Sequence, residues 1–147
     1  MPRRELKYPH QIENWLAEWG AQLSESGSLV LVGSGGLLWH AAQRGLDCPL
    51  PENSMDVDPV TESDAVALLG YEAMIGSDFE KEHGWHVNLM PVAVLKEMDP
   101  GWEARASRKV YGHLSVTVPS MPDLLAPKLK RGEPRDKLHA QWAKNLP

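Results

Sequence analysis

The sequence predicts a single α/β (α+β) domain in which a short mixed sheet is flanked by helices and followed by two C-terminal helices. Three observations support this fold class. Helix-like and strand-like hydrophobic patterns alternate along the chain. Twelve glycines and twelve prolines divide it into many short elements. Its 147 residues suffice for one hydrophobic core and leave no room for a second independent domain.

The first elements are expected to be a helix, a strand and a second helix. Apolar residues recur at helical spacing over residues 10–24. The apolar run 29–32 predicts a strand that is buried on both faces. A glycine-rich turn over 33–36 and a helix over 37–44, which ends at Gly45, are expected to follow.

A loop, a strand and a third helix are expected next. Residues 47–53 contain two prolines and no periodicity, which indicates a loop. Residues 54–58 alternate in polarity and predict a strand closed by Pro59, with one apolar face and one face formed by Ser54, Asp56 and Asp58. Thr61 or Ser63 is expected to cap a helix that ends at Gly70.

The rest of the chain supplies the remaining strands and helices. We expect a short helix over 77–83, a strand over 85–90, a hairpin over 110–118 with its turn near Gly112, a helix that begins at Ser120 and a helix from Pro134 to about Lys144. The domain thus divides into an N-terminal helix (1–27), a core of sheet and helices (28–118) and the C-terminal helices (119–147).

The charge and cysteine content narrow the function. Fifteen basic against twenty acidic residues give a formal net charge of −5, which argues against duplex DNA as a partner. The single cysteine, Cys48, excludes an internal disulfide. The chain shows neither a signal-peptide pattern nor an apolar stretch near the eighteen or so residues of a membrane span. We therefore expect a cytoplasmic protein that does not engage a membrane.

The glycine-rich stretch Gly33-Ser34-Gly35-Gly36 is the first candidate site. Glycine lets a phosphate approach the backbone, and the start of the next helix offers unpaired N–H donors and a positive dipole end. A plain tight connection that needs glycine for its dihedral angles explains the same residues equally well.

The second candidate site is the acidic pair Asp56 and Asp58. Residues two apart in a strand project to the same face about 7 Å apart, close enough for two carboxylates to share divalent cations. A solvated acidic strand is the alternative. Together, a phosphate-binding turn and a metal-binding strand indicate a site for a metal-bound triphosphate.

These residues resemble a known family. The Val32-Gly33-Ser34 turn, followed about twenty residues later by Ser54-Met55-Asp56-Val57-Asp58, resembles the signature of the polymerase-beta-like nucleotidyltransferase superfamily. Residues 122–129, followed by Arg135-Asp136, are similar to the C-terminal helices of its small bacterial members, which are often found in toxin–antitoxin operons. The resemblance covers roughly residues 29 to 140.

The resemblance implies a nucleotidyltransferase-like fold and a function. Gly33 and Ser34 would bind the phosphates of a nucleoside triphosphate, with Ser54 as a further nucleotide contact. Asp56 and Asp58 would be the catalytic residues and would bind two Mg²⁺ ions, with a third carboxylate on a neighbouring strand. The implied reaction transfers a nucleoside monophosphate to a hydroxyl group of an RNA or protein acceptor.

The sequence departs from the family pattern at two positions. His86 and Asn88 stand where the third carboxylate is expected, and a neutral amide supplies neither negative charge nor a general base. Glu52 stands where small relatives often carry arginine. An alternative function is therefore that of a catalytically inactive member that binds a partner protein in a toxin–antitoxin pair.

Two further features bear on the nucleotide. Residues 128–137 carry five basic and two acidic side chains, a local charge of +3, and Lys128 is a candidate phosphate or RNA contact, with a solvated helix face as the alternative. The glycine-rich turn also permits a weaker alternative, a dinucleotide-binding fragment in which Asp56 binds the ribose, although Leu38 occupies the position of the third glycine.

Overall fold

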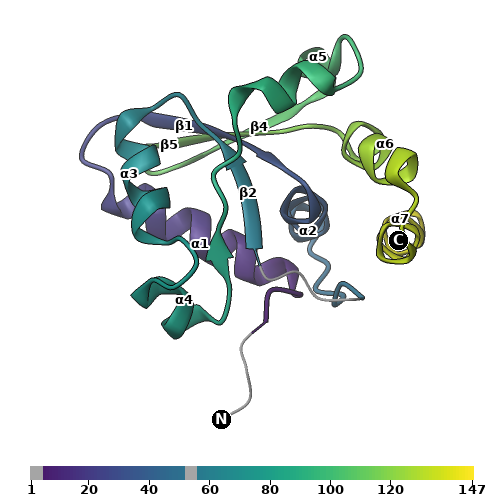
Figure 1. Cartoon of the computed structure of the whole chain (residues 1–147), viewed down its shortest axis with the longest axis horizontal. Coiled ribbons are helices and arrows are strands. Elements are labelled where there is room, and N and C mark those ends of the chain that lie inside the picture. The colour runs from purple at the N-terminus through teal and green to yellow at the C-terminus, as the bar shows by residue number, and fades with distance from the viewer. Residues whose placement is uncertain (1–4, 52–55) are drawn as a thin grey trace.

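The structure is a computed structural model that describes residues 5–51 and 56–147 of the chain. Over these residues it contains a five-stranded mixed sheet with helices around it (Figure 1), which confirms the α/β (α+β) class. The strands are β1 (Gly27–Val32), β2 (Asp56–Val60), β3 (His86–Val87), β4 (Ser107–Tyr111) and β5 (Leu114–Val118). The helices are α1 (Pro9–Gln22), α2 (Ser34–Gln43), α3 (Asp64–Glu72), α4 (Asp78–His83), the 3-10 helix η1 (Val92–Glu97), α5 (Trp102–Arg105), α6 (Met121–Arg131) and α7 (Pro134–Lys144).

The strand order is β3-β2-β1-β5-β4. β1 is parallel to β5 and antiparallel to β2, while β2 is parallel to β3 and β4 is antiparallel to β5. In the antiparallel pair, Val32 at the end of β1 lies opposite Asp58 in β2. This register brings the turn that follows β1 next to the acidic residues of β2.

The hydrophobic core lies between the sheet and the helices α1 and α2, which contact both the strands and each other. Trp15 of α1 makes edge-on contacts with Trp19 and Trp85, with ring centroids 4.9 and 6.1 Å apart. On the other side of α2, α6 contacts α2 and α7 contacts α6, so that these three helices lie together at the right of the view in Figure 1.

The predicted burial of the first strand on both faces is wrong. Leu29 and Leu31 are buried, whereas Val30 and Val32 are only half-buried, because α1 and α2 pack against one face alone. Val32 and its partner Asp58 belong to the less covered face, and this leaves room for a cleft there.

The second helix begins earlier than predicted. Only Gly33 forms the turn, with φ 73° and ψ −159°, and α2 begins at Ser34. Gly35 and Gly36 therefore lie in the first turn of the helix. Leu124 of α6 lies so close to Gly36 that a Cβ atom there would lie 2.8 Å from Leu124 Cδ1, so glycine lets the two helices approach.

The acidic strand continues past the proline that was expected to close it. Pro59 lies within β2, opposite Leu31 of β1. Its carbonyl accepts a hydrogen bond from the N–H of Met90, on the side away from β1, so its nitrogen also faces away from β1 and no bond to β1 is lost. The following strand is shorter than predicted, since β3 spans only His86–Val87.

Several predicted boundaries are confirmed. Ser77 caps α4, Ser120 caps α6, and the hairpin turns between Tyr111 and Leu114. α7 runs from Pro134 to Lys144. By contrast, Gly70 does not end α3: it lies inside the helix, where a Cβ atom would lie 2.7 Å from the side chain of Leu89.

The helices η1 and α5 were not predicted. They lie between the short strand β3 and the edge strand β4. None of the helices in the described part of the chain has the length and apolar character needed to cross a lipid bilayer.

Candidate functional site

A cleft of about 1000 Å³ lies where β1 and β2 meet the C-terminal helices. One wall consists of the turn after β1, the acidic strand and the residues after β3; the opposite wall comes from α6 and α7; a third side is formed by η1 and the residues around it. The polar side chains that line the cleft are Ser34, Asp56, Asp58, Asn88, Glu97, Asp99, Asp123, Lys128, Lys130, Arg131 and Arg135.

The turn at Gly33 sets the floor of the cleft. Its positive φ and extended ψ are a combination that only glycine adopts readily. A Cβ atom at Gly33 would also lie 2.6 Å from Oδ2 of Asp58, so the carboxylate packs directly against the glycine backbone. The ten-residue helix α2 begins at the next residue, Ser34, and its N-terminus lies beside the cleft. The first N–H groups of a helix have no partner within the helix, and this end carries the positive end of the helix dipole.

Asp56 and Asp58 alternate with the buried Val57, are half-buried and both line the cleft. Nδ2 of Asn88 donates a hydrogen bond of 3.2 Å to Oδ1 of Asp58. Burial and, after it, the negative charge of Asp56 raise the pKa of Asp58 to about 6, although the bond from Asn88 acts in the opposite direction. An amide thus contacts the acidic pair where the resemblance predicts a third carboxylate.

Lys128 lies across the cleft from the acidic pair, on α6. It is buried, with only 6% of its surface exposed, so the alternative of a solvated helix face is wrong for this residue. Its Nζ donates a hydrogen bond of 3.0 Å to Oγ of Ser34 and lies 3.9 Å from Oδ1 of Asp136. Burial lowers the pKa of Lys128, while the charge of Asp136 opposes this shift.

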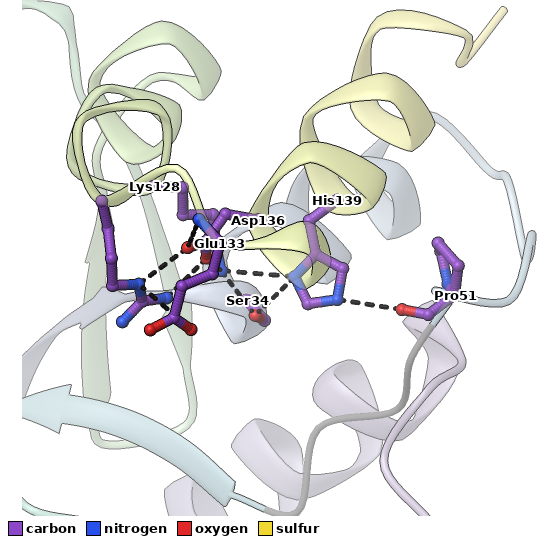
Figure 2. A network of polar contacts seen from close by, with 7 residues as sticks. Ser34, Pro51, Lys128, Glu133, Asp136 and His139 are labelled. Atoms are coloured by element: carbon purple, nitrogen blue, oxygen red, sulfur yellow. Dashed lines mark hydrogen bonds and ion pairs between the residues drawn. The ribbon is translucent and has the colours of Figure 1, made fainter.

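A polar network joins Lys128 to α7 (Figure 2). Nε and Nη2 of Arg131 donate to the two carboxylate oxygens of Asp136 over 2.7 and 2.5 Å. These bonds lower the pKa of Asp136 to about 2. The imidazole of His139 lies 3.2 Å from Oγ of Ser34 through Nδ1 and 2.9 Å from the carbonyl oxygen of Pro51 through Nε2.

Neither Asp136 nor His139 was singled out as a site residue from the sequence. Both have no exposed surface, and they are three residues apart on α7, so they share a face of that helix. This spacing, together with the basic residues before it, is the sequence signal that could have indicated Asp136 and His139 as site residues. It does not by itself reveal that the shared face points to Ser34.

No family model, curated protein or solved structure matches the chain significantly.

The function must therefore be inferred from the cleft itself. Within residues 5–51 and 56–147, no group of three or more histidine, cysteine, aspartate or glutamate side chains is arranged to hold a metal ion. The acidic wall instead offers two carboxylates and the amide of Asn88.

The structure brings most of the predicted site residues together. Gly33, Ser34, Asp56, Asp58 and Lys128 all line the same cleft, although their roles remain predictions. The predicted nucleotide contact Ser54 and the departure at Glu52 lie outside the described residues.

The weaker alternative of a dinucleotide-binding fragment fits the topology poorly. A dinucleotide-binding unit joins two parallel strands through a helix, whereas β1 and β2 on either side of α2 are antiparallel.

Proposed function

We propose that the protein binds a nucleoside triphosphate with Mg²⁺ and transfers a nucleoside monophosphate to an acceptor hydroxyl, as the resemblance to polymerase-beta-like nucleotidyltransferases implies. The observation that carries the proposal is the division of charge in the cleft. Two carboxylates, Asp56 and Asp58, lie on one wall, and four cationic side chains, Lys128, Lys130, Arg131 and Arg135, lie on the wall formed by α6 and α7. The carboxylate that α6 also contributes to this wall, Asp123, is bound by Arg105.

The acidic wall fits a divalent cation in its chemistry. Asp56 and Asp58 lie two residues apart on one face of β2, and their mutual repulsion is one cause of the raised pKa of Asp58. Carboxylate oxygens are the ligands that Mg²⁺ prefers. Bound there, Mg²⁺ would neutralise charge on the triphosphate and on both carboxylates.

The remaining residues account for the binding of the phosphates. The backbone of Gly33 is open to close approach, and the N-terminus of α2 at Ser34 presents N–H donors and a positive dipole end. Lys128 supplies a fixed positive charge, held at Ser34 by a hydrogen bond. The exposed cations Lys130 and Arg135 extend the positive wall outward.

Calorimetric titration with Mg²⁺ and each of ATP, GTP, CTP and UTP tests the proposal. We expect the wild type to bind at least one of them, and Asp56→Asn with Asp58→Asn to weaken this binding at least about tenfold, since both carboxylates are then neutral. Asp64→Asn, which neutralises an exposed carboxylate on α3 away from the cleft, is the matched control. The proposal fails if the wild type binds none of the four.

Transfer is tested separately with triphosphates labelled at the α-phosphate and pools of RNA and protein. We expect the wild type to label one pool and Asp58→Asn to label neither.

A second candidate function is that of an inactive nucleotidyltransferase-like protein that binds a partner protein. Asn88 favours it, because an amide contacts Asp58 where the family supplies a third carboxylate. The end of α3 and the turn after it also carry exposed apolar side chains, among them Tyr71 and Ile75, which are 62% and 71% exposed. Label transfer that depends on Asp58 would exclude this candidate.

A further inference from the structure

We propose that His139 is a positioning residue of the nucleotide site, which holds Ser34 and Lys128 in place for the triphosphate; this rests on the function proposed above. Its imidazole has no exposed surface. It connects three separate parts of the chain: Ser34 at the start of α2, Lys128 on α6 and Pro51 in the segment ahead of β2. Figure 2 shows it between the serine and the proline.

The hydrogen-bond partners determine which nitrogen carries the proton. The carbonyl of Pro51 only accepts, so Nε2 of His139 donates to it over 2.9 Å. In the neutral ring Nδ1 is then an acceptor. Two donors face it, the hydroxyl of Ser34 at 3.2 Å and the ammonium of Lys128 at 3.3 Å.

A single direction of donation follows from this assignment. An ammonium group only donates, so Lys128 donates to Oγ of Ser34. The proton of that hydroxyl is then directed to Nδ1 of His139, and His139 donates in turn to Pro51. The imidazole thus links Ser34 to the carbonyl of Pro51 in a chain of hydrogen bonds that fixes the position of the ammonium of Lys128, which lines the cleft. A cation held in place in this way binds an anion at a smaller entropic cost than a mobile one.

The contacts at Nδ1 favour the neutral ring. A second proton on Nδ1 would face the ammonium of Lys128 at 3.3 Å and remove the acceptor that Ser34 uses. Asp136, the nearest carboxylate on α7, is already bound on both oxygens by Arg131.

Two amide variants separate the functions of the two ring nitrogens. In His139→Asn the amide reaches the position of Nδ1 and keeps an acceptor for Ser34. In His139→Gln it reaches the position of Nε2 and keeps only the donor to Pro51. The probe is Mg²⁺ with whichever of the four nucleoside triphosphates binds the wild type most tightly. We expect His139→Gln to weaken its binding about tenfold, and His139→Asn to stay within about twofold of the wild type.

The wild type gives a second test that needs no variant. Nitrogen-15 NMR of the histidine side chains should show Nδ1 of His139 without a proton and Nε2 with one at neutral pH, and the Nδ1 signal should shift when the triphosphate binds. A protonated Nδ1 would overturn the inference, as would equal affinities of the wild type and His139→Gln. A wild type that binds no triphosphate would instead contradict the proposed function itself.

Discussion

At the scale of single residues, Asp58 has the most consequential environment in the cleft. Its carboxylate lies against the backbone of Gly33, accepts a bond from Asn88 and faces the charge of Asp56. The ionised form of Asp58 therefore lowers the stability of the folded protein. The raised pKa of about 6 reflects this destabilisation.

Replacing Asp58 should stabilise the protein above neutral pH. Its pKa rises from 3.8 to about 6 on folding, so the wild type loses stability as the pH rises from about 4 to about 6. Asp58→Asn keeps the acceptor for Asn88 and removes the charge. We expect its free energy of unfolding to exceed that of the wild type by up to about 3 kcal/mol at pH 8 and by almost nothing near pH 4. Urea denaturation in the presence of a chelator measures the free energy of unfolding of the wild type and the variant at each pH. A variant less stable than the wild type at pH 8 would contradict this account.

Gly33→Ala should destabilise the fold by about 2 to 3 kcal/mol. The added Cβ atom would lie 2.6 Å from Oδ2 of Asp58. The alanine backbone must also adopt a φ of 73°. Gly45→Ala is the control, because Gly45 has a similar φ of 71° but open surroundings. The free energy of unfolding of this variant should fall by only about 1 kcal/mol. Equal losses in urea denaturation would show that the approach of Asp58 to Gly33 is unimportant.

At the scale of elements, the contact between α2 and α6 determines the width of the cleft. Gly36 lies against Leu124 on α6, four residues before Lys128. Any side chain at Gly36 therefore pushes against the helix that carries the central cation.

Two adjacent substitutions in α2 test this contact. Gly36→Ala places a Cβ atom 2.8 Å from Leu124 Cδ1 and 3.1 Å from the carbonyl oxygen of Leu31, and should cost about 1 to 2 kcal/mol. Gly35→Ala meets its neighbours at 3.4 Å or more, so it should be neutral or stabilise by up to about 1 kcal/mol through its helix propensity. Thermal denaturation of the pair distinguishes them; a Gly36→Ala variant as stable as Gly35→Ala would rule out a tight α2–α6 contact.

The elements that the sequence predicts well are those whose signals are local. Caps and prolines mark α6 and α7, and helical periodicity marks α1. The predicted ends of the strand at Pro59 and of the helix at Gly70 were wrong, because whether each residue fits inside its element depends on partners far away in the chain. The nitrogen of Pro59 faces away from β1, and Gly70 makes room for Leu89. Propensity alone contains neither fact.

At the scale of the whole molecule, the net charge of −5 conceals a division into an acidic strand and a basic pair of helices. We expect the dissociation constant for a short DNA duplex to exceed about 0.1 mM at physiological salt. Electrophoretic mobility of the duplex measures this. A shift at micromolar protein that Lys130→Glu with Arg135→Glu abolishes would contradict the expectation and would identify the cleft as the binding surface.

The sequence predicted the parts of the site that belong to short motifs. Gly33, Ser34, Asp56 and Asp58 form recognisable local patterns, and the basic segment indicated Lys128. His139 escaped notice because its role depends on the packing of α7 against the start of α2, a contact between residues 105 positions apart. Tertiary arrangement of this kind leaves no periodic trace in a single sequence.

The pairing of β1 with β5 determines when the cleft can form during synthesis. Gly27 lies opposite Leu114, so the centre of the sheet cannot assemble until most of the chain has left the ribosome. The acidic strand emerges long before α6 and α7, which supply the opposing charges. A nascent chain that stalls before Ser120 therefore carries Asp56 and Asp58 without the cationic side chains of α6 and α7 that face them across the cleft in the folded protein.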